Sequence, residues 1–220
     1  ISFALAGYKV TALEPYPSET VGSGAIQKLA EHYQLSDFEV KTDFAEKISY
    51  QNDSFDIVYA RQSMHHAHNL EKFVAEAARV LKPGGIFMSV RDHVVFDDKD
   101  KEWFLKSHPL HHFYGGENAY SPDVYRAAMV RAGLDILEEI RHYENVINYY
   151  PQTEDEIKNY RKYELSRRKQ HLENKLGLIS RLWPIPQLYN LYLYFRGRRI
   201  TAPDERNVAG RLYSYICRKQ

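Results

Sequence analysis

The chain is poor in cysteine, in long apolar runs and in targeting patterns. Its single cysteine, Cys217, excludes an internal disulfide framework and a cysteine-rich zinc site. No apolar run approaches the roughly 20 residues that a transmembrane helix needs, and no signal-peptide pattern opens the sequence. These shortages predict a protein of a reducing compartment, cytoplasmic by default, without a transmembrane segment.

Net charge is also low, at +1, but it is unevenly distributed over the 220 residues. Residues 151–220 hold 15 Lys and Arg against 7 Asp and Glu, a net of +8, whereas residues 1–150 hold 15 against 22, a net of −7. Such asymmetry is typical of a solvated helical face. It is equally compatible with a basic surface for an anionic substrate, nucleic acid or lipid headgroups.

The clearest pattern lies in residues 54–90. Two short apolar runs, Phe55 to Ala60 and Ile86 to Val90, are typical of buried parallel strands. Between them, apolar residues recur at helical spacing and would pack one helix face on the sheet. They are Leu70, Phe73, Val74, Ala77, Ala78 and Leu81. Pro83-Gly84-Gly85 ends this helix, so the block predicts a right-handed βαβ unit.

Weaker patterns predict the remaining elements. In chain order they are a strand at 9–13, a helix from Ser18 to about Tyr33, a strand at 38–42 and a helix starting at Ser121-Pro122. They continue with a strand at 136–150, a charged helix at 152–176 begun by Thr153, a Pro-broken loop with a Tyr/Leu-rich helix within 182–199, and a terminal strand at 211–218. Strands alternating with helices predict an α/β fold.

Two predicted strands end in acidic residues. Glu14 closes the first, and Asp43 follows the next, beside Phe44. At the carboxyl edge of a parallel sheet, one carboxylate can accept both hydroxyls of a ribose. The other can accept an adenine amino group while the aromatic ring covers the base. Either acid taken alone is equally compatible with a loop residue that caps a helix.

Four segments in order, ALEP, DFAE, FDIVYARQSMHH and EAARVLKPGGIFMSV, resemble the class I S-adenosylmethionine-dependent methyltransferases of the small-molecule group. The resemblance covers residues 1 to about 140. It implies a Rossmann-like fold with strand order 3-2-1-4-5-7-6, an antiparallel last strand at residues 211–218, and S-adenosyl-L-methionine bound at the carboxyl edge. It assigns Glu14 to the ribose hydroxyls, Asp43 and Phe44 to the adenine, and Arg61 with Gln62 to the wall beside the methionine moiety.

The family's first strand and its glycine-rich loop would lie before Ile1. We therefore expect this chain to be a fragment of a longer protein; the alternative is a natural protein in which another element replaces that strand. The expected organisation is a Rossmann-like core of residues 1–150 with 205–220, and a basic, tyrosine-rich helical insertion of residues 151–204.

His65 and His66 directly follow the fourth strand of that family order. There the resemblance places residues that face the transferred methyl group and its acceptor. A neutral imidazole at this point could take the acceptor's proton, because its pKa lies near working pH. The alternative is that one of the pair packs or hydrogen-bonds within the loop.

A second histidine-rich segment, residues 107–120, is predicted to be a lid or substrate loop. Its candidate substrate contacts are His111, Tyr114 and Tyr120. Because Pro109 breaks the helical spacing of the neighbouring histidines, no metal site is predicted. An ordinary aromatic loop remains the alternative reading.

The basic insertion contains an apolar helical face formed by Leu188, Leu191, Tyr192 and Phe195. As a core helix, it would bury this face. Otherwise the insertion could cover the substrate pocket, pair with a second copy in a homodimer, or lie on a membrane surface as a peripheral contact.

The sequence as a whole favours methyl transfer from S-adenosyl-L-methionine to a small-molecule hydroxyl, amine or carboxyl group by in-line displacement. A nucleic-acid methyltransferase fits less well, because the turn ARQSMHH lacks the Asn/Asp-Pro-Pro-aromatic signature of base amino methylation. A methyltransferase-like binding subunit without activity is the other alternative. A nicotinamide-dependent dehydrogenase fits poorly with LKPGG and the two histidines.

Overall fold

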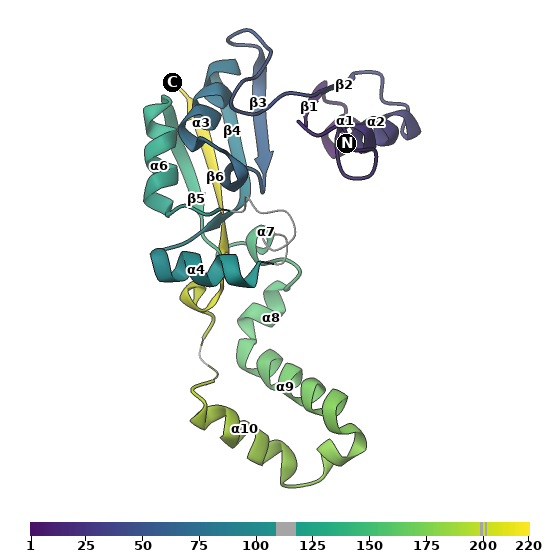
Figure 1. The fold of residues 1–220 in the computed structure, drawn as a ribbon, viewed down its shortest axis with the longest axis vertical. Helices are drawn as coiled ribbons and strands as arrows, with labels where there is room; N and C mark the ends of the chain where they lie inside the picture. The colour runs from purple at the N-terminus through teal and green to yellow at the C-terminus, as the bar shows by residue number, and fades with distance from the viewer. Residues whose placement is uncertain (109–117, 199, 201) are drawn as a thin grey trace.

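The computed structural model describes residues 1–108, 118–198, 200 and 202–220. Their strands form a two-stranded sheet, β1-β2, and a four-stranded sheet in the order β3-β4-β6-β5. Figure 1 shows the smaller sheet beside β3, at the end of the larger sheet farthest from β5. The arrangement is the mixed α/β fold that the alternating pattern predicts.

The N-terminal unit contains α1 (Ser2–Leu5), β1 (Val10–Leu13), α2 (Ser23–His32) and β2 (Phe38–Lys41). β1 and β2 are parallel, with Val10 opposite Phe38. The predicted start of α2 at Ser18 is wrong. The Ser18 hydroxyl instead accepts hydrogen bonds within a turn, and Gly22 caps the helix. A Cβ on Gly22 would lie 2.2 Å from the carbonyl oxygen of Tyr16, so the turn packs too tightly for the helix to begin earlier.

The larger sheet contains β3 (Phe55–Arg61), β4 (Leu81–Val94), β5 (Leu134–Ile140) and β6 (Arg211–Lys219). β3 and β4 are parallel, and β6 is antiparallel to both β4 and β5. Within each sheet the neighbours agree with the predicted order: β1 pairs with β2, and the larger sheet runs β3-β4-β6-β5. Among the described residues, no strand pairing joins the two sheets.

One face of the larger sheet is covered by α3 (Leu70–Val80) and α6 (Pro122–Arg131), as Figure 1 shows. The side chains of Asn69 and Ser121 cap these helices by accepting from the backbone N–H three residues on. The predicted apolar face of α3 is buried against the sheet. The core also contains Met64, Phe87, Tyr125, Met129, Tyr213, Tyr215 and Cys217.

Two predicted boundaries are wrong in the larger sheet. β4 begins at Leu81, before the Pro-Gly-Gly turn, and runs on to Val94. The strand predicted over 136–150 ends at Ile140, and α7 (Val146–Tyr149) follows it. β5 ends at Ile140 because of Asn148, which is fully buried. Its side-chain amide donates to the carbonyl oxygens of Ile140 and Arg141. This contact folds the chain back at the carboxyl edge of the sheet.

The remaining elements lie at and beyond that edge: η1 (Met64–His66), α4 (Asp98–Ser107), α8 (Glu154–Lys158), α9 (Tyr160–Leu176), η2 (Gly177–Arg181), α10 (Ile185–Phe195) and η3 (Glu205–Asn207). Thr153 and Glu156 form a capping box that starts α8. The single helix predicted over 152–176 is broken at Asn159. Figure 1 shows α8, α9 and α10 extending away from the sheet. Within the described residues, we find no helix with the length and apolarity to cross a bilayer.

Candidate functional site

The turn after β3 separates the two candidate histidines. Gln62 adopts a left-handed conformation, with φ of 48°, and its N–H donates to the carbonyl oxygen of Val90 at 2.9 Å. This bond ties the turn to the end of β4, and η1 follows at once. His65 is buried, with 2% of its surface exposed, whereas His66 is exposed. Their ring centroids are 4.1 Å apart.

Asp92 fixes the orientation of His65. Its Oδ1 lies 3.0 Å from His65 Nδ1 and accepts the His65 backbone N–H at 3.2 Å. Its Oδ2 accepts the hydroxyl of Ser89 at 2.5 Å. Because a carboxylate only accepts, this contact favours a proton on Nδ1 of His65. Asp92 is fully buried, so its bonds replace solvation that its charge requires.

A local irregularity in β4 brings Ser89 and Asp92 together. The pairing of β4 with β6 shifts register between these residues, and Arg91 has a φ of +63°. In a regular strand, residues three apart point to opposite faces, whereas an extra residue at a bulge turns them to the same side. Sequence reasoning missed Asp92. The available signal was an Arg-Asp-His run at the end of an apolar strand, on the edge where His65 was expected.

His93, the next residue, extends the site toward α4. Its ring lies 4.8 Å from that of His65 and 4.6 Å from that of Phe104, and its Nδ1 is 2.6 Å from the carbonyl oxygen of Gly210. Burial, with the neighbouring His65, lowers the pKa of His93 to about 4. His93 is therefore neutral at working pH. Despite this density of imidazoles, no three potential ligands among the described side chains are grouped to bind a metal ion.

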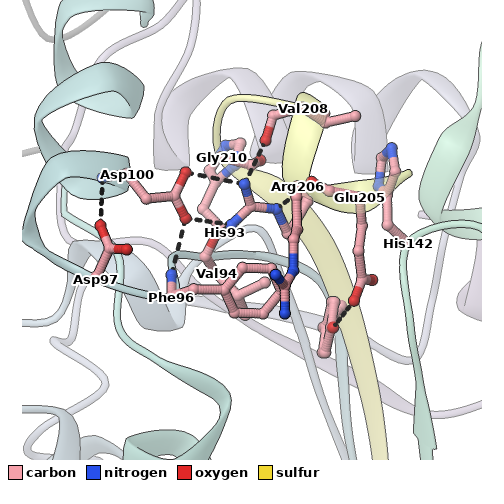
Figure 2. A network of polar contacts seen from close by, with 12 residues as sticks. His93, Val94, Phe96, Asp97, Asp100, His142, Glu205, Arg206, Val208 and Gly210 are labelled. Atoms are coloured by element: carbon pink, nitrogen blue, oxygen red, sulfur yellow. Dashed lines mark hydrogen bonds and ion pairs between the residues drawn. The ribbon is translucent and has the colours of Figure 1, made fainter. Parts of the chain in front are cut away.

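Arg211 forms the outer support of this site. Its buried guanidinium pairs with Asp100 of α4, with Nη2 2.8 Å from Oδ1, and also donates to the carbonyl oxygens of Glu205 and Val208. Figure 2 shows these groups around the labelled Gly210, beside His93. The network fixes the start of β6 against α4. It thereby fixes the position of the Gly210 carbonyl oxygen, which hydrogen-bonds with Nδ1 of His93.

The cofactor candidates Glu14, Asp43 and Phe44 lie at the carboxyl ends of β1 and β2. The N–H of Glu14 donates to the carbonyl oxygen of Lys41 at 3.1 Å, which continues the strand pairing to the acid. Glu14 Oε1 accepts the N–H of Tyr16 at 3.1 Å, and Asp43 Oδ2 accepts the N–H of Ser49 at 2.9 Å. Within the described part of the chain, the second oxygen of each carboxylate has no hydrogen-bond donor. The Phe44 side chain is 51% exposed.

Arg61 and Gln62, the other cofactor candidates, are exposed at the end of β3. They lie with His65 and His66 on the larger sheet, whereas Glu14, Asp43 and Phe44 lie on the smaller one. The structure therefore groups the candidates into two sets. A ring contact between Phe3 of α1 and Tyr59 of β3, with centroids 5.1 Å apart, links the two sheets.

Of the three candidate substrate contacts, His111 and Tyr114 lie outside the described residues. Tyr120 forms a bridge with Val94, and its hydroxyl donates to the carbonyl oxygen of Ala67 at 3.4 Å. Ala67 directly follows η1. Tyr120 itself is thus attached to the histidine turn.

Comparison with known proteins relates this geometry to a family. Residues 2–89 match the model of a methyltransferase domain. The chain is 33% identical over 107 residues to an uncharacterized methyltransferase, YcgJ, of Bacillus subtilis, covering 46% of this chain and 42% of that protein. It is 33% identical over 132 residues to the sterol 24-C-methyltransferase ERG6 of Saccharomyces cerevisiae, covering 56% and 34%. The chain thus spans less than half the length of these curated relatives.

Solved structures show the same fold. The B. subtilis YcgJ structure matches all of this chain and 86% of its own, with a TM-score of 0.57 and 18% identity. A geranyl diphosphate C-methyltransferase from Streptomyces coelicolor, determined with S-adenosyl-L-homocysteine, matches all of this chain and 66% of its own, with a TM-score of 0.60 and 12% identity. At such identities the likeness shows the fold alone.

Proposed function

Because this chain belongs to the class I S-adenosylmethionine-dependent methyltransferases, we propose that it transfers a methyl group from S-adenosyl-L-methionine to a small-molecule hydroxyl, amine or carboxyl acceptor. The observation that carries the proposal is the hydrogen-bonded set of Ser89, Asp92 and His65 at the carboxyl edge of β4, beside the exposed His66. This set joins the buried Asp92 to the histidine turn, at which the sequence resemblance places the reactants.

The N-terminal carboxylates fit the nucleoside part of the cofactor. Glu14 has one oxygen held by a backbone N–H and a second that can accept ribose hydroxyls. Asp43 is held in the same manner by Ser49 and offers its second oxygen to an adenine amino group, beside the exposed Phe44 ring. Arg61 and Gln62 are the residues proposed beside the methionine moiety. When bound, the cofactor would supply an electrophilic methyl group on a sulfonium.

The two histidines have different proposed roles in methyl transfer. His66 is the exposed member, so it is the one that an acceptor can reach, and it takes the proton of a hydroxyl or amine as the new bond to carbon forms. His65 is a positioning residue. Asp92 binds both its ring and its backbone N–H, which holds η1 and therefore His66 in place. Alignment of acceptor and methyl group supplies most of the rate.

The relatives support a small organic acceptor. Proteins named for methylation of sterols and of geranyl diphosphate are among those similar to this chain. Each name denotes a molecule with an extended hydrocarbon part, which in geranyl diphosphate ends in a charged diphosphate group. Tyr120, packed between the histidine turn and Tyr125, is the described residue proposed to line the acceptor side.

The test is transfer of a radiolabelled methyl group. The chain is incubated with methyl-labelled cofactor and a cell extract, and the extract is then separated into small molecules, protein and nucleic acid. We expect label in the small-molecule fraction, reduced about 100-fold in His66→Gln. His68→Gln, another exposed histidine of the same loop, is the matched control and should retain the rate. Label in the nucleic-acid fraction, or in none, would contradict the proposal.

A further inference from the structure

The helix α10 exposes the apolar face that a core helix would bury. Leu188, Leu191, Tyr192 and Phe195 are 57%, 50%, 56% and 78% exposed. Their spacing of three and four residues places them on one side of the helix. The opposite side is the packed one, since Leu193 is 5% exposed. The alternative that these four residues belong to the core is therefore wrong.

The preceding turn exposes a second apolar group. Leu178 and Ile179 of η2 are 77% and 59% exposed, and Leu182 and Trp183, which follow it, are 60% and 80% exposed. We call these eight side chains of η2, its following turn and α10 the lobe face. In Figure 1, η2 and α10 lie at the end of the molecule farthest from the helix-covered sheet. Large apolar side chains exposed together on adjoining segments are typical of an interaction surface.

Basic residues surround the lobe face. Residues 151–200 contain 11 Lys and Arg against 5 Asp and Glu, a net of +6. Lys175 closes α9 just before the face, and Arg196 and Arg198 follow α10. All three are exposed. The partner must therefore combine an apolar interior with negative charge at its surface.

We propose that the lobe face docks the protein on a lipid bilayer that contains anionic lipids. Leu and Phe side chains enter the acyl boundary, Trp183 and Tyr192 lie at the headgroup level, and the flanking cations contact the lipid phosphates. The contact lies at the surface of one leaflet, which is the depth that an amphipathic helix of this kind reaches. The proposal does not depend on methyl transfer.

Charge distinguishes this partner from the alternatives. A homodimer through the lobe face would bring together two copies of residues 151–200, each with a net charge of +6, and their repulsion opposes association. A nucleic acid would be held by the cations, and the apolar centre would contribute little. An anionic bilayer satisfies both parts of the surface at once.

Vesicle sedimentation with the native chain tests the proposal, using phosphatidylcholine vesicles with about one quarter phosphatidylserine and vesicles of phosphatidylcholine alone. We expect strong binding to the mixed vesicles, weakened as salt rises from about 0.1 M to about 0.5 M. Leu191→Ser/Phe195→Ser should reduce the partition coefficient at least about tenfold. Lys175→Glu/Arg196→Glu should do the same on mixed vesicles.

Matched controls carry equivalent changes elsewhere. Val124→Ser/Val130→Ser alters exposed apolar residues of α6, and Lys9→Glu alters an exposed cation; both should bind like the native chain. Circular dichroism checks that every variant is folded. Failure of the native chain to sediment with mixed vesicles would overturn the proposal. So would binding unaffected by the apolar substitutions, or a dimer in light scattering that those substitutions dissociate while vesicle binding persists.

Discussion

Asp92 of strand β4 holds His65 in position at the proposed transfer site. It is fully buried and accepts the ring N–H and backbone N–H of His65, together with the Ser89 hydroxyl. Sequence patterns predicted His65 and His66 as candidates but not Asp92. A side chain three residues from Ser89 meets it only because the strand bulges, and a bulge forms through pairing with β6, which is distant in sequence.

Replacing Asp92 by Asn should slow methyl transfer about 10- to 100-fold while leaving cofactor affinity unchanged. The amide no longer fixes the proton on Nδ1 of His65, so η1 loses the contact that positions His66. The labelled-methyl assay measures the rate, and calorimetry measures the affinity. Asp98→Asn, an exposed acid on α4, is the control. A native rate in Asp92→Asn would exclude the positioning role.

Two other histidines, the buried His142 and the half-buried His93, contribute to the dependence of stability on pH. Burial lowers the pKa of His93 and of His142 to about 4. Nδ1 of His142 also accepts the N–H of Leu212 at 3.1 Å, a bond that protonation would remove. In the unfolded chain both imidazoles titrate near pH 6.5. The unfolded state therefore gains protons first as the pH falls.

The stabilisation from these neutral histidines is complete above about pH 6.5 and is lost as the pH falls through the interval down to about 4. Between about pH 7.5 and about pH 5 we expect a loss of about 2 kcal/mol per histidine in the free energy of unfolding. Urea unfolding at both pH values measures it. His93→Asn/His142→Asn should flatten the dependence. An equally steep loss in that variant would show that other groups cause it.

Among the elements, the contact between α4 and the start of β6 is sensitive to a small substitution. Gly210 has a φ of +55°, and a Cβ there would lie 2.0 Å from Cδ2 of Phe104. Gly210→Ala should therefore lower the free energy of unfolding by more than about 2 kcal/mol, because backbone strain adds to displacement of the ring. The same shift would disturb His93, which meets the Gly210 carbonyl oxygen.

Gly133 provides the matched control for this substitution. It too is left-handed, with a φ of +77°, but a Cβ there would meet no atom within 4 Å. Gly133→Ala should lower the free energy of unfolding by only about 1 kcal/mol, because backbone strain is its single cause. Urea unfolding compares the two variants. Equal losses would show that the Phe104 contact contributes nothing.

Local signals predicted some elements well and others poorly. α3 and α6 lie where their patterns predict them. Both patterns, the apolar spacing of α3 and the Ser121-Pro122 start of α6, involve residues that are close in sequence. α7 depends instead on Asn148, whose side-chain oxygen accepts the hydroxyl of Ser214, 66 residues away, at 2.6 Å. No local pattern contains that contact. The burial of α10 likewise could not be decided from its periodicity, because an apolar face is equally regular when it is exposed.

At the scale of the whole molecule, sequence reasoning predicted the strand neighbours within each sheet and the antiparallel β6 through a family resemblance. It also predicted a helical insertion before β6. It did not predict how the candidate residues divide between two sheets. Glu14, Asp43 and Phe44 lie on one sheet and Arg61, Gln62, His65 and His66 on the other. The proposed function requires both sets to serve one cofactor.

Calorimetric titration with S-adenosyl-L-homocysteine tests that requirement most directly. We predict saturable heat at one site per chain, at least about tenfold weaker affinity in Glu14→Ala through loss of hydrogen bonds to a charged group, and a similar loss in Arg61→Ala. Glu19→Ala, which changes an exposed acid paired with Lys28, should bind like the native chain. Saturable binding weakened by both substitutions would support a shared cofactor site. Absence of heat from the native chain, or native affinity in Glu14→Ala, would contradict it.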